Sequence, residues 1–145
     1  AYGKIEIDER QVIEFPSGIP GFENLRKFAL MDAAQQPFYW LQSMEVVEIA
    51  FVMIDPHIFR PDYSVELSED EREELEISDF PGEDSLLFTI VTIPENQAKM
   101  TANLQGPVVI NRLTKKGRQF INSDTKWKTK HFILDELDSV RTEAC

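Results

Sequence analysis

The residues that could do chemistry are few in this chain, and their spacing matches no catalytic pattern. It has two histidines, His57 and His131, and one cysteine, Cys145. Neither a nucleophile elbow nor a Cys–His signature is present, although a Ser-His-Asp set scattered along the sequence stays open. The stretch DPHIFRPDY offers Asp55, His57 and Asp62, but a metal site needs several converging ligands, and these prolines and spacings match no ligand motif. We therefore expect no metal and no cofactor.

The stretch FPSGIPGFE, residues 15–23, is rich in glycine and proline but does not look like a phosphate-binding loop. Gly18 and Gly21 lack the third glycine and the strand–turn–helix setting of a dinucleotide site. Because proline fixes φ and glycine permits positive φ, the stretch indicates a rigid corner between strands. We expect Ile19 and Phe22 to fold inward and plug one end of the fold, with an exposed contact role for Phe22 as the alternative.

The charge of the chain restricts its partners. A formal net charge of -11 argues against nucleic acid as the main partner, because phosphate binding needs a surplus of Lys and Arg. It favours steering toward a basic protein. Between Glu66 and Asp84 there are ten acidic residues and one basic residue, whereas between Asn111 and His131 there are seven Lys or Arg and one acidic residue. The alternatives are two solvated surfaces, the usual meaning of a charge run, or a patch that recognises a basic partner.

The elements that would position these residues are mostly strands. Short runs rich in β-branched and aromatic residues, bounded by turn formers, predict strands at 2–7, 11–15, 27–31, 38–43, 50–54, 86–93, 107–113 and 118–122. Their spacing indicates an all-β, mainly antiparallel fold. The run 86–93 is expected centrally and buried on both faces, and a hairpin is expected to turn at 115–117. Ser68 and Glu71 form a capping box that predicts a short surface helix, and residues 94–100 are a second helical candidate.

Length and composition predict one domain. A chain of 145 residues that is 42% hydrophobic is typical of a single globular domain. We expect it to span residues 1–122 and to be followed by a C-terminal segment, 123–145, that is partly disordered. No apolar run approaches the roughly 20 residues of a membrane helix, so we expect no membrane partner. The single cysteine permits no intrachain disulfide, which fits a reducing cytosol.

Large apolar side chains occur in one loop, where Ile58, Phe59 and Tyr63 surround Pro56 and Pro61. Such residues most often plug the end of a barrel. The alternative is an exposed apolar patch, which marks a protein-binding surface.

Several segments together resemble the flagellar assembly factor FliW family: FPSGIPGFENLRKFALMD, PFYWLQSMEVVEIAFVMIDPHIFRPDY and LLFTIVTIPENQAKMTANLQGPVVIN. They occur in the family's order with close spacing, and the resemblance runs from Tyr2 to Asn122. IPGFE, PFYWLQS, the loop with DP and PDY, and TANLQGPVVIN are specific in combination, whereas each alone would be weak. DELDSVRTEAC lies outside the match.

The resemblance implies a small β-barrel-like fold, closed or partly open, with one or two short helices, in the bacterial cytoplasm and without catalytic activity. It implies a protein that binds CsrA, a dimeric RNA-binding translational repressor, and prevents it from repressing flagellin mRNA. It also implies binding of flagellin near its terminal helices, so that free flagellin sequesters the protein and CsrA is released. The acidic stretch could mimic RNA or could repel RNA from a neighbouring site, and the resemblance favours the second, non-competitive mode. We expect a free monomer that binds no nucleic acid directly.

The candidate site residues rest on charge and on the apolar loop, since the resemblance does not assign their contacts. For an apolar protein contact we predict Ile58, Phe59 and Tyr63. As the source of the negative field that meets CsrA we predict Glu69, Asp70, Glu71, Glu73, Glu74 and Glu76. Two other classes stay open: a small enzyme or ligand-binding barrel with a deep pocket, and an RNA-binding barrel that uses the basic stretch 112–130.

Overall fold

The structure is a computed structural model, and it describes residues 11–80 and 82–144. The predicted strand at 2–7 lies outside these residues, and each of the other seven predicted strands is present with small shifts of its ends. The described strands are β1 (Val12–Glu14), β2 (Lys27–Asp32), β3 (Tyr39–Ser43), β4 (Ala50–Ile54), β5 (Ser85–Thr92), β6 (Thr101–Ala102), β7 (Val108–Asn111), β8 (Lys116–Gln119) and β9 (His131–Phe132). The fold is therefore mostly β, as predicted.

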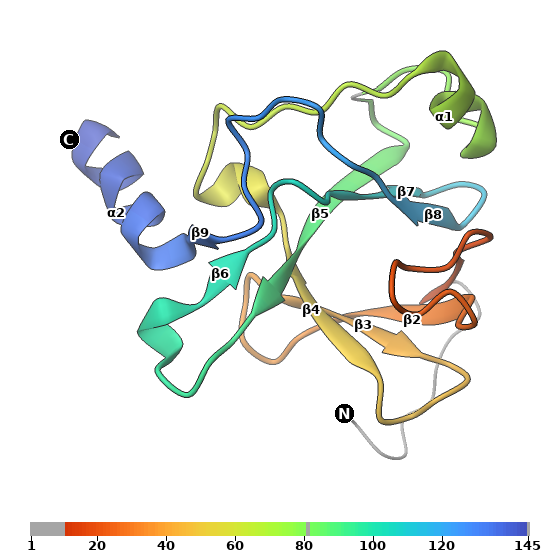
Figure 1. Ribbon diagram of the computed structural model, residues 1–145, viewed down its shortest axis with the longest axis horizontal. Helices are drawn as coiled ribbons and strands as arrows, with labels where there is room; N and C mark the ends of the chain where they lie inside the picture. Colours follow the sequence, from red (N-terminus) through yellow and green to blue (C-terminus); the bar gives the residue numbers. More distant parts are fainter. Residues whose placement is uncertain (1–10, 81, 145) are drawn as a thin grey trace.

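Seven of these strands close into a barrel (Figure 1). The order is β4-β3-β2-β1-β8-β7-β5, and a further pairing of β4 with β5 closes the ring. All neighbours in the ring are antiparallel except β1 and β8, which run parallel with Glu14 opposite Lys116. β6 continues the sheet beyond β5, and β9 pairs with β6. The barrel is closed rather than partly open, and closure removes the free edges at which another strand could add.

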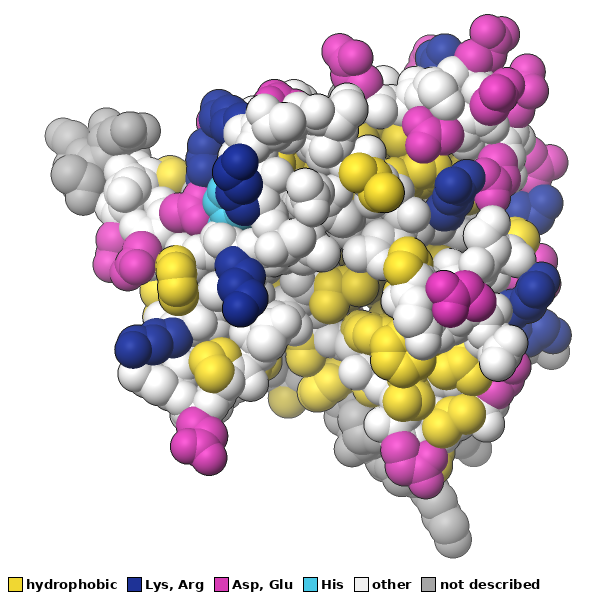
Figure 2. Space-filling view, viewed as in Figure 1, with side chains coloured by type: hydrophobic (Ala, Val, Ile, Leu, Met, Phe, Trp, Pro, Cys, Tyr) yellow, Lys and Arg dark blue, Asp and Glu magenta, His cyan; other side chains and the backbone are white. Residues whose placement is uncertain are grey.

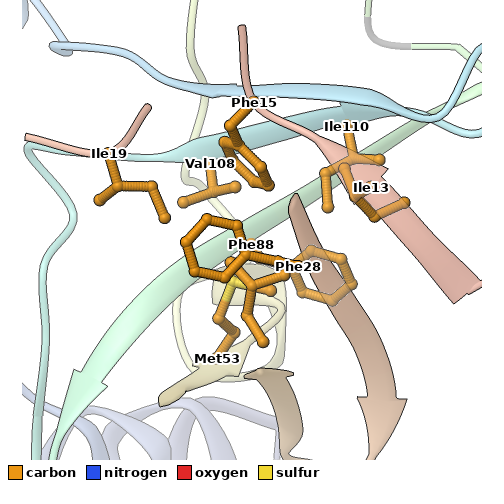
Figure 3. Packing of buried hydrophobic residues seen from close by; sticks show 9 residues of the cluster. Ile13, Phe15, Ile19, Phe28, Met53, Phe88, Val108 and Ile110 are labelled. Carbon is orange, nitrogen blue, oxygen red and sulfur yellow. The ribbon is translucent and has the colours of Figure 1, made fainter. Parts of the chain in front are cut away.

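The interior of the barrel is filled with apolar side chains. One cluster of buried residues from the barrel strands and the corner after β1 contains Ile13, Phe15, Ile19, Phe28, Leu41, Met53, Phe88, Val108 and Ile110 (Figure 3). The rings of Phe15 and Phe28 meet edge to face at 5.3 Å. Gly117 on β8 makes room for this packing, since a Cβ built on it would lie 2.9 Å from Cζ of Phe15. Side chains occupy the space that a ligand would need in a binding barrel.

The corner at residues 15–23 has the predicted conformation, with φ of 68° at Gly18 and 89° at Gly21. Ile19 is 2% exposed and points into the core, as expected. Phe22 does not, because it is 37% exposed and its ring packs edge to face on Phe51 at 5.3 Å. The inward prediction is therefore correct for Ile19 and wrong for Phe22, which lies at the surface.

Helical structure is limited in the described residues. α1 (Glu69–Glu74) has the predicted capping box at Ser68, and α2 (Ile133–Ala144) follows β9. Short 3-10 turns occur at η2 (Pro56–Ile58) and η3 (Gln97–Lys99). The helix expected at residues 94–100 is therefore only the single turn η3. Neither described α-helix has the length and apolar character that crossing a membrane requires.

The position of the β7–β8 turn differs from the prediction of 115–117. Asn111 ends β7, and its side-chain oxygen accepts hydrogen bonds from the backbone N–H groups of Leu113 and Thr114 at 2.8 and 3.2 Å. Lys115 takes a positive φ of 62°, and Lys116 already begins β8. An asparagine that bonds to the backbone two residues on starts the turn early.

β5 is central as predicted, paired with β4, β6 and β7, but its first three residues are only partly buried.

The core continues past residue 122, where the sequence places the end of the domain. Trp127 is 1% exposed and Ile133 is 3% exposed, and both belong to a second buried cluster at the η2 end of the barrel. His131 and Phe132 form β9, which pairs with β6. A buried tryptophan and a paired strand hold this segment on the barrel, so the expected boundary at residue 122 does not match the packing.

Candidate protein-binding site

α1 is an exposed acidic element fixed at both of its ends. The hydroxyl of Ser68 accepts from the backbone N–H of Glu71 at 3.1 Å, and Glu71 Oε1 accepts from the N–H of Ser68 at 2.8 Å. Beyond the helix, Leu75 and Ile77 are buried in a cluster with Val109. The helix itself buries no residue, so its side chains meet solvent. Acidic side chains gather at this end of the molecule in Figure 2.

Three of the six predicted acidic residues already have partners. Glu74 accepts from the hydroxyl of Ser17 at 3.1 Å and forms a short ion pair with Arg118. Glu76 lies 3.3 Å from Nζ of Lys116. Glu71 is held by the capping box described above. The two ion pairs neutralise Glu74 and Glu76, which therefore contribute little to a long-range field, whereas the bond from a backbone N–H leaves Glu71 charged.

The other three are Glu69, Asp70 and Glu73, and all are exposed. Among the described residues, no hydrogen bond or ion pair joins their carboxylates to another side chain. One cation, Arg72, lies on the same helix. The negative field of this surface therefore comes mainly from these three carboxylates and from Glu71, four of the six that the sequence predicts.

The acidic and basic stretches, which look separate in the sequence, pair with each other in space. Three of the seven Lys or Arg residues between 111 and 131 pair with the acidic stretch: Arg112 with Asp84 at 3.6 Å, Lys116 with Glu76, and Arg118 with Glu74. A fourth, Lys126, pairs at 2.9 Å with Asp62, which precedes that stretch. An RNA-binding groove needs cations that are available to phosphates. This pairing argues against the RNA-binding alternative.

The apolar loop prediction needs correction. Phe59 is 0% exposed and Tyr63 is 3% exposed, whereas Ile58 is 39% exposed. The Tyr63 hydroxyl donates to the backbone oxygen of Leu104 at 2.7 Å, and its ring meets Trp127 edge to face at 4.8 Å. Burial raises the pKa of Tyr63 to about 12. Phe59 and Tyr63 plug one end of the barrel, so only Ile58 can touch a partner, and whether it does stays a prediction.

The histidine of the same loop has a structural setting. Asp55 caps η2 by accepting from the N–H of His57 at 2.9 Å, and Nε2 of His57 lies 3.0 Å from the oxygen of Tyr63. Across residues 11–80 and 82–144, no group of three or more His, Cys, Asp or Glu side chains is arranged to hold a metal ion. The side chains of DPHIFRPDY therefore fix a turn.

A charged network attaches α2 to the barrel. Arg60 donates to both carboxylate oxygens of Asp62 at 3.0 and 2.9 Å and to Glu136 on α2 at 2.7 Å. Its guanidinium lies 4.6 Å from the ring centroid of Trp127. The hydrogen bonds from Arg60 and Lys126 hold the pKa of Asp62 well below its usual range. The Arg60–Asp62 pair therefore stays charged at neutral pH, and Arg60 and Lys126 both lie over the ring of Trp127.

The search for apolar contact residues in the sequence missed Ile121, which is 83% exposed and is the most exposed large apolar side chain among the described residues. Strand periodicity could have found it. Phe120 and Asn122 on either side are 3% and 8% exposed, and alternation turns the residue between them outward. Ile121 lies beside Glu71 in one groove, which brings an apolar residue close to the acidic helix.

The fold defines a class: small closed β-barrels whose interior is filled with apolar side chains. A protein-family model described as FliW protein matches residues 1–133. The chain is 44% identical over 139 residues to the flagellar assembly factor FliW of Treponema denticola, covering 96% of this chain and 93% of the relative. It is 40% identical over 145 residues to that of Alkaliphilus metalliredigens, covering 99% and 88%. The chain belongs to the FliW family, as the sequence resemblance predicts.

A solved structure agrees with this assignment. The crystal structure of the flagellar assembly factor FliW superposes on this fold with a TM-score of 0.84 and 37% identity, covering 91% of this chain and 92% of that chain. The match in sequence and fold together supports the family assignment, and the match in fold alone supports the barrel.

Proposed function

We propose that this chain is a non-enzymatic regulator of flagellum assembly in the cytoplasm, and that it binds the repressor CsrA and flagellin in turn. Its relatives carry the name flagellar assembly factor, which supports the assembly role. The observation that supports a basic partner is the set of unpaired carboxylates at Glu69, Asp70 and Glu73 on an exposed helix. An RNA-binding repressor must present cations to RNA, so it is complementary to this surface.

The proposed mechanism is electrostatic and non-competitive. The protein docks beside the RNA site of CsrA, and the field of α1 then opposes the phosphate backbone. Juxtaposed like charges cost several kcal/mol, which is enough to release a ligand of moderate affinity. Because Glu69, Asp70 and Glu73 lack partners among the described residues, their charge is available for this effect. Direct mimicry of RNA by the same carboxylates is the competing mechanism.

Flagellin provides the switch. In this proposal free flagellin binds the protein, so CsrA is released and binds its mRNA again. Export of flagellin frees the protein to bind CsrA. The switch requires that the two partners exclude one another, either through a shared surface or through overlapping volume.

A competition titration tests the function. Labelled CsrA is bound to the protein, flagellin is added, and fluorescence anisotropy follows the release of CsrA. We expect flagellin to displace CsrA, and the affinity for CsrA to fall as salt rises because exposed charges are screened over about 8–10 Å. Failure to bind either partner at low salt would refute the function, and salt-independent binding of CsrA would refute the electrostatic mechanism.

A second titration separates the two mechanisms. RNA is added in increasing excess to CsrA while its affinity for the protein is measured. In the non-competitive mode the apparent Kd reaches a plateau once CsrA is saturated with RNA. A Kd that rises without limit would indicate direct mimicry.

A further inference from the structure

A pocket of about 320 Å³ lies outside the barrel, on the face of the sheet that turns away from the filled interior. The sheet contributes Trp40 on β3 and Val52 on β4, which lie opposite each other in the ladder. Leu41 and Met53, the next residues along each strand, belong to the cluster inside the barrel, so alternation turns Trp40 and Val52 outward. Both stand on strands paired on either side, so this part of the pocket is already in place before a ligand arrives.

The second buried cluster covers only part of this outer face. Val52 is paired with Val91, and Val91 with Ala102, so the three side chains form a row on one side of the sheet. Val91 and Ala102 are buried in the cluster that contains Trp127. Val52, at the other end of the row, is only partly buried and lines the pocket. The pocket is therefore the uncovered end of an apolar face.

Two connections between strands form the walls of the pocket. The connection between β2 and β3 contributes residues that include Ala34, Gln35 and Phe38, and the connection between β5 and β6 contributes residues that include Gln97 and Met100. In Figure 1 both connections lie near the C-terminal end of β5. The walls are therefore mostly apolar, with one amide side chain on each connection.

The lining of this pocket carries no charge, which distinguishes it from other grooves in the described part of the chain. The groove beside Ile121 includes Glu71 and Arg118, and the groove beside α2 includes Arg60 and Glu136. All the residues that line the present pocket are apolar side chains or glutamine. A charged ligand would lose water here without gaining a partner for its charge, which is strongly unfavourable. The ligand that fits is uncharged.

Size and chemistry favour a small molecule over a macromolecule. A volume of about 320 Å³ lies within the range of roughly 300–1,000 Å³ that is typical of small-molecule sites. A stable protein interface buries about 800 Å² on each partner, which needs a wider surface than this pocket offers. The rings of Phe38 and Trp40 favour an aromatic ligand. The amides of Gln35 and Gln97 each offer a hydrogen-bond donor and an acceptor.

We propose that this pocket binds an uncharged aromatic small molecule that carries at least one hydrogen-bonding group. The ring of the ligand packs on Trp40, Phe38 and Val52, and its polar group meets Gln35 or Gln97 at the rim. This site is independent of the proposed function, because it requires neither CsrA nor flagellin.

The test titrates naphthalene carboxamide, an uncharged aromatic amide, into isotope-labelled protein and follows the indole N–H signals by NMR. The chain has two tryptophans, so Trp40 reports on the pocket and the buried Trp127 serves as an internal reference. We expect the Trp40 signal to shift and saturate with a Kd of about 1 mM or below, the affinity of a compound of this size in a matching pocket. Naphthalene carboxylate, which has the same ring and a charge, should bind at least about tenfold more weakly.

Variants of exposed residues test whether the compound binds in the pocket. Ala34→Trp fills the pocket from one wall and should weaken binding at least about tenfold. Replacing Gln35 and Gln97 together by alanine should weaken it about fivefold, the scale of one lost hydrogen bond. The matched control is Leu113→Trp, because Leu113 is 68% exposed in the β7–β8 turn and the substitution adds the same side chain outside the pocket.

The proposal is overturned if the Trp40 signal does not move, if Ala34→Trp binds the compound as tightly as Leu113→Trp, or if the carboxylate binds equally well. If the compound does not bind and Ala34→Trp instead weakens the binding of CsrA or flagellin, the pocket receives a side chain of a protein partner and the small-molecule proposal is wrong. Binding of the compound by a protein that binds neither CsrA nor flagellin would leave this site standing and remove the proposed function.

Discussion

Removing the unpaired charges of α1 should weaken CsrA binding without unfolding the protein. The variant combines Glu69→Gln, Asp70→Asn and Glu73→Gln, which keep side-chain size and remove charge. The capping box at Ser68 and Glu71 is left intact. None of the three side chains is buried, so we expect at most about 1 kcal/mol of destabilisation, mainly from lost charge in the first helical turn.

The magnitude follows from Coulomb's law. A carboxylate about 10 Å from a cation of CsrA contributes about 0.4 kcal/mol in water, so three contribute about 1.2 kcal/mol before screening. At about 0.01 M salt the Debye length is about 30 Å and most of this remains, which predicts about fivefold weaker binding. At about 0.15 M salt the Debye length is about 8 Å, and the expected loss is only about twofold.

The assay is anisotropy of labelled CsrA at both salt concentrations, with association rates from stopped flow. Exposed charges act mainly on the association rate, so most of the loss should appear there. The control variant makes the same change in net charge at exposed sites away from α1: Asp32→Asn, Glu95→Gln and Asp135→Asn. Asp135 lies in the first turn of α2, which matches the loss of charge at a helix start.

Two outcomes would refute the reasoning. If the control weakens binding as much as the α1 variant, net charge matters and the placement of the carboxylates does not. If the α1 variant binds normally at low salt, the acidic helix is only a solvated surface and CsrA docks elsewhere.

Three further predictions concern the framework. Tyr63→Phe should cost about 1–3 kcal/mol of unfolding free energy, because the oxygen of Leu104 loses its buried donor. Because burial raises the pKa of Tyr63 to about 12, the neutral hydroxyl contributes its full stability below pH 10, and this contribution is lost as pH rises toward 12. The free energy of unfolding, measured in urea between pH 10 and 12, should therefore fall more steeply in the wild type than in the variant. Gly117→Ala places a Cβ 2.9 Å from Phe15 and should lower Tm through about 1–3 kcal/mol of overpacking. Glu136→Gln weakens the ion pair with Arg60, so amide exchange should speed up in α2 and not in the barrel.

Each of these has an outcome that would contradict it. Equal alkaline slopes for wild type and Tyr63→Phe would mean that the hydroxyl is solvated. An unchanged Tm for Gly117→Ala would mean that the barrel interior is loosely packed. Unchanged protection of α2 in Glu136→Gln would mean that apolar contacts, such as that of Ile133, suffice to hold the helix.

Much of the barrel could be predicted because its strands are long enough to show a pattern. β2, β3, β4 and β5 each have at least five residues, and the capping box marked α1 unambiguously. β6 and β9 have two residues each, so no local pattern exists, and they form because tertiary pairing aligns them. α2 was predictable in principle, since Ile133, Leu137 and Val140 recur at helical spacing.

The candidate site was harder to predict because charges were counted along the sequence and not across the sheet. The β7–β8 hairpin lies against the end of α1 and the residues that follow it, so Lys116 meets Glu76 and Arg118 meets Glu74. Sequence distance hides this pairing, so two of the six predicted carboxylates were counted in the negative field although cations neutralise them. Trp127 was hidden in the same way, because it lies between two lysines in the sequence and beneath Arg60 and Lys126 in space.

Burial of the loop aromatics explains where a partner can dock. A closed barrel needs plugs at its ends, and Phe59 and Tyr63 are used for this, so they cannot also form a contact surface. Closure also pairs most strand edges of the ring, which leaves the outer edge of β9, loops, helices and outward-facing strand residues among the sites open to a partner. Ile121 meets this condition because periodicity turns it outward while its neighbours are held in the core, and it lies beside the acidic helix. An apolar anchor next to a steering charge gives one surface both residence time and association rate, which neither feature provides alone.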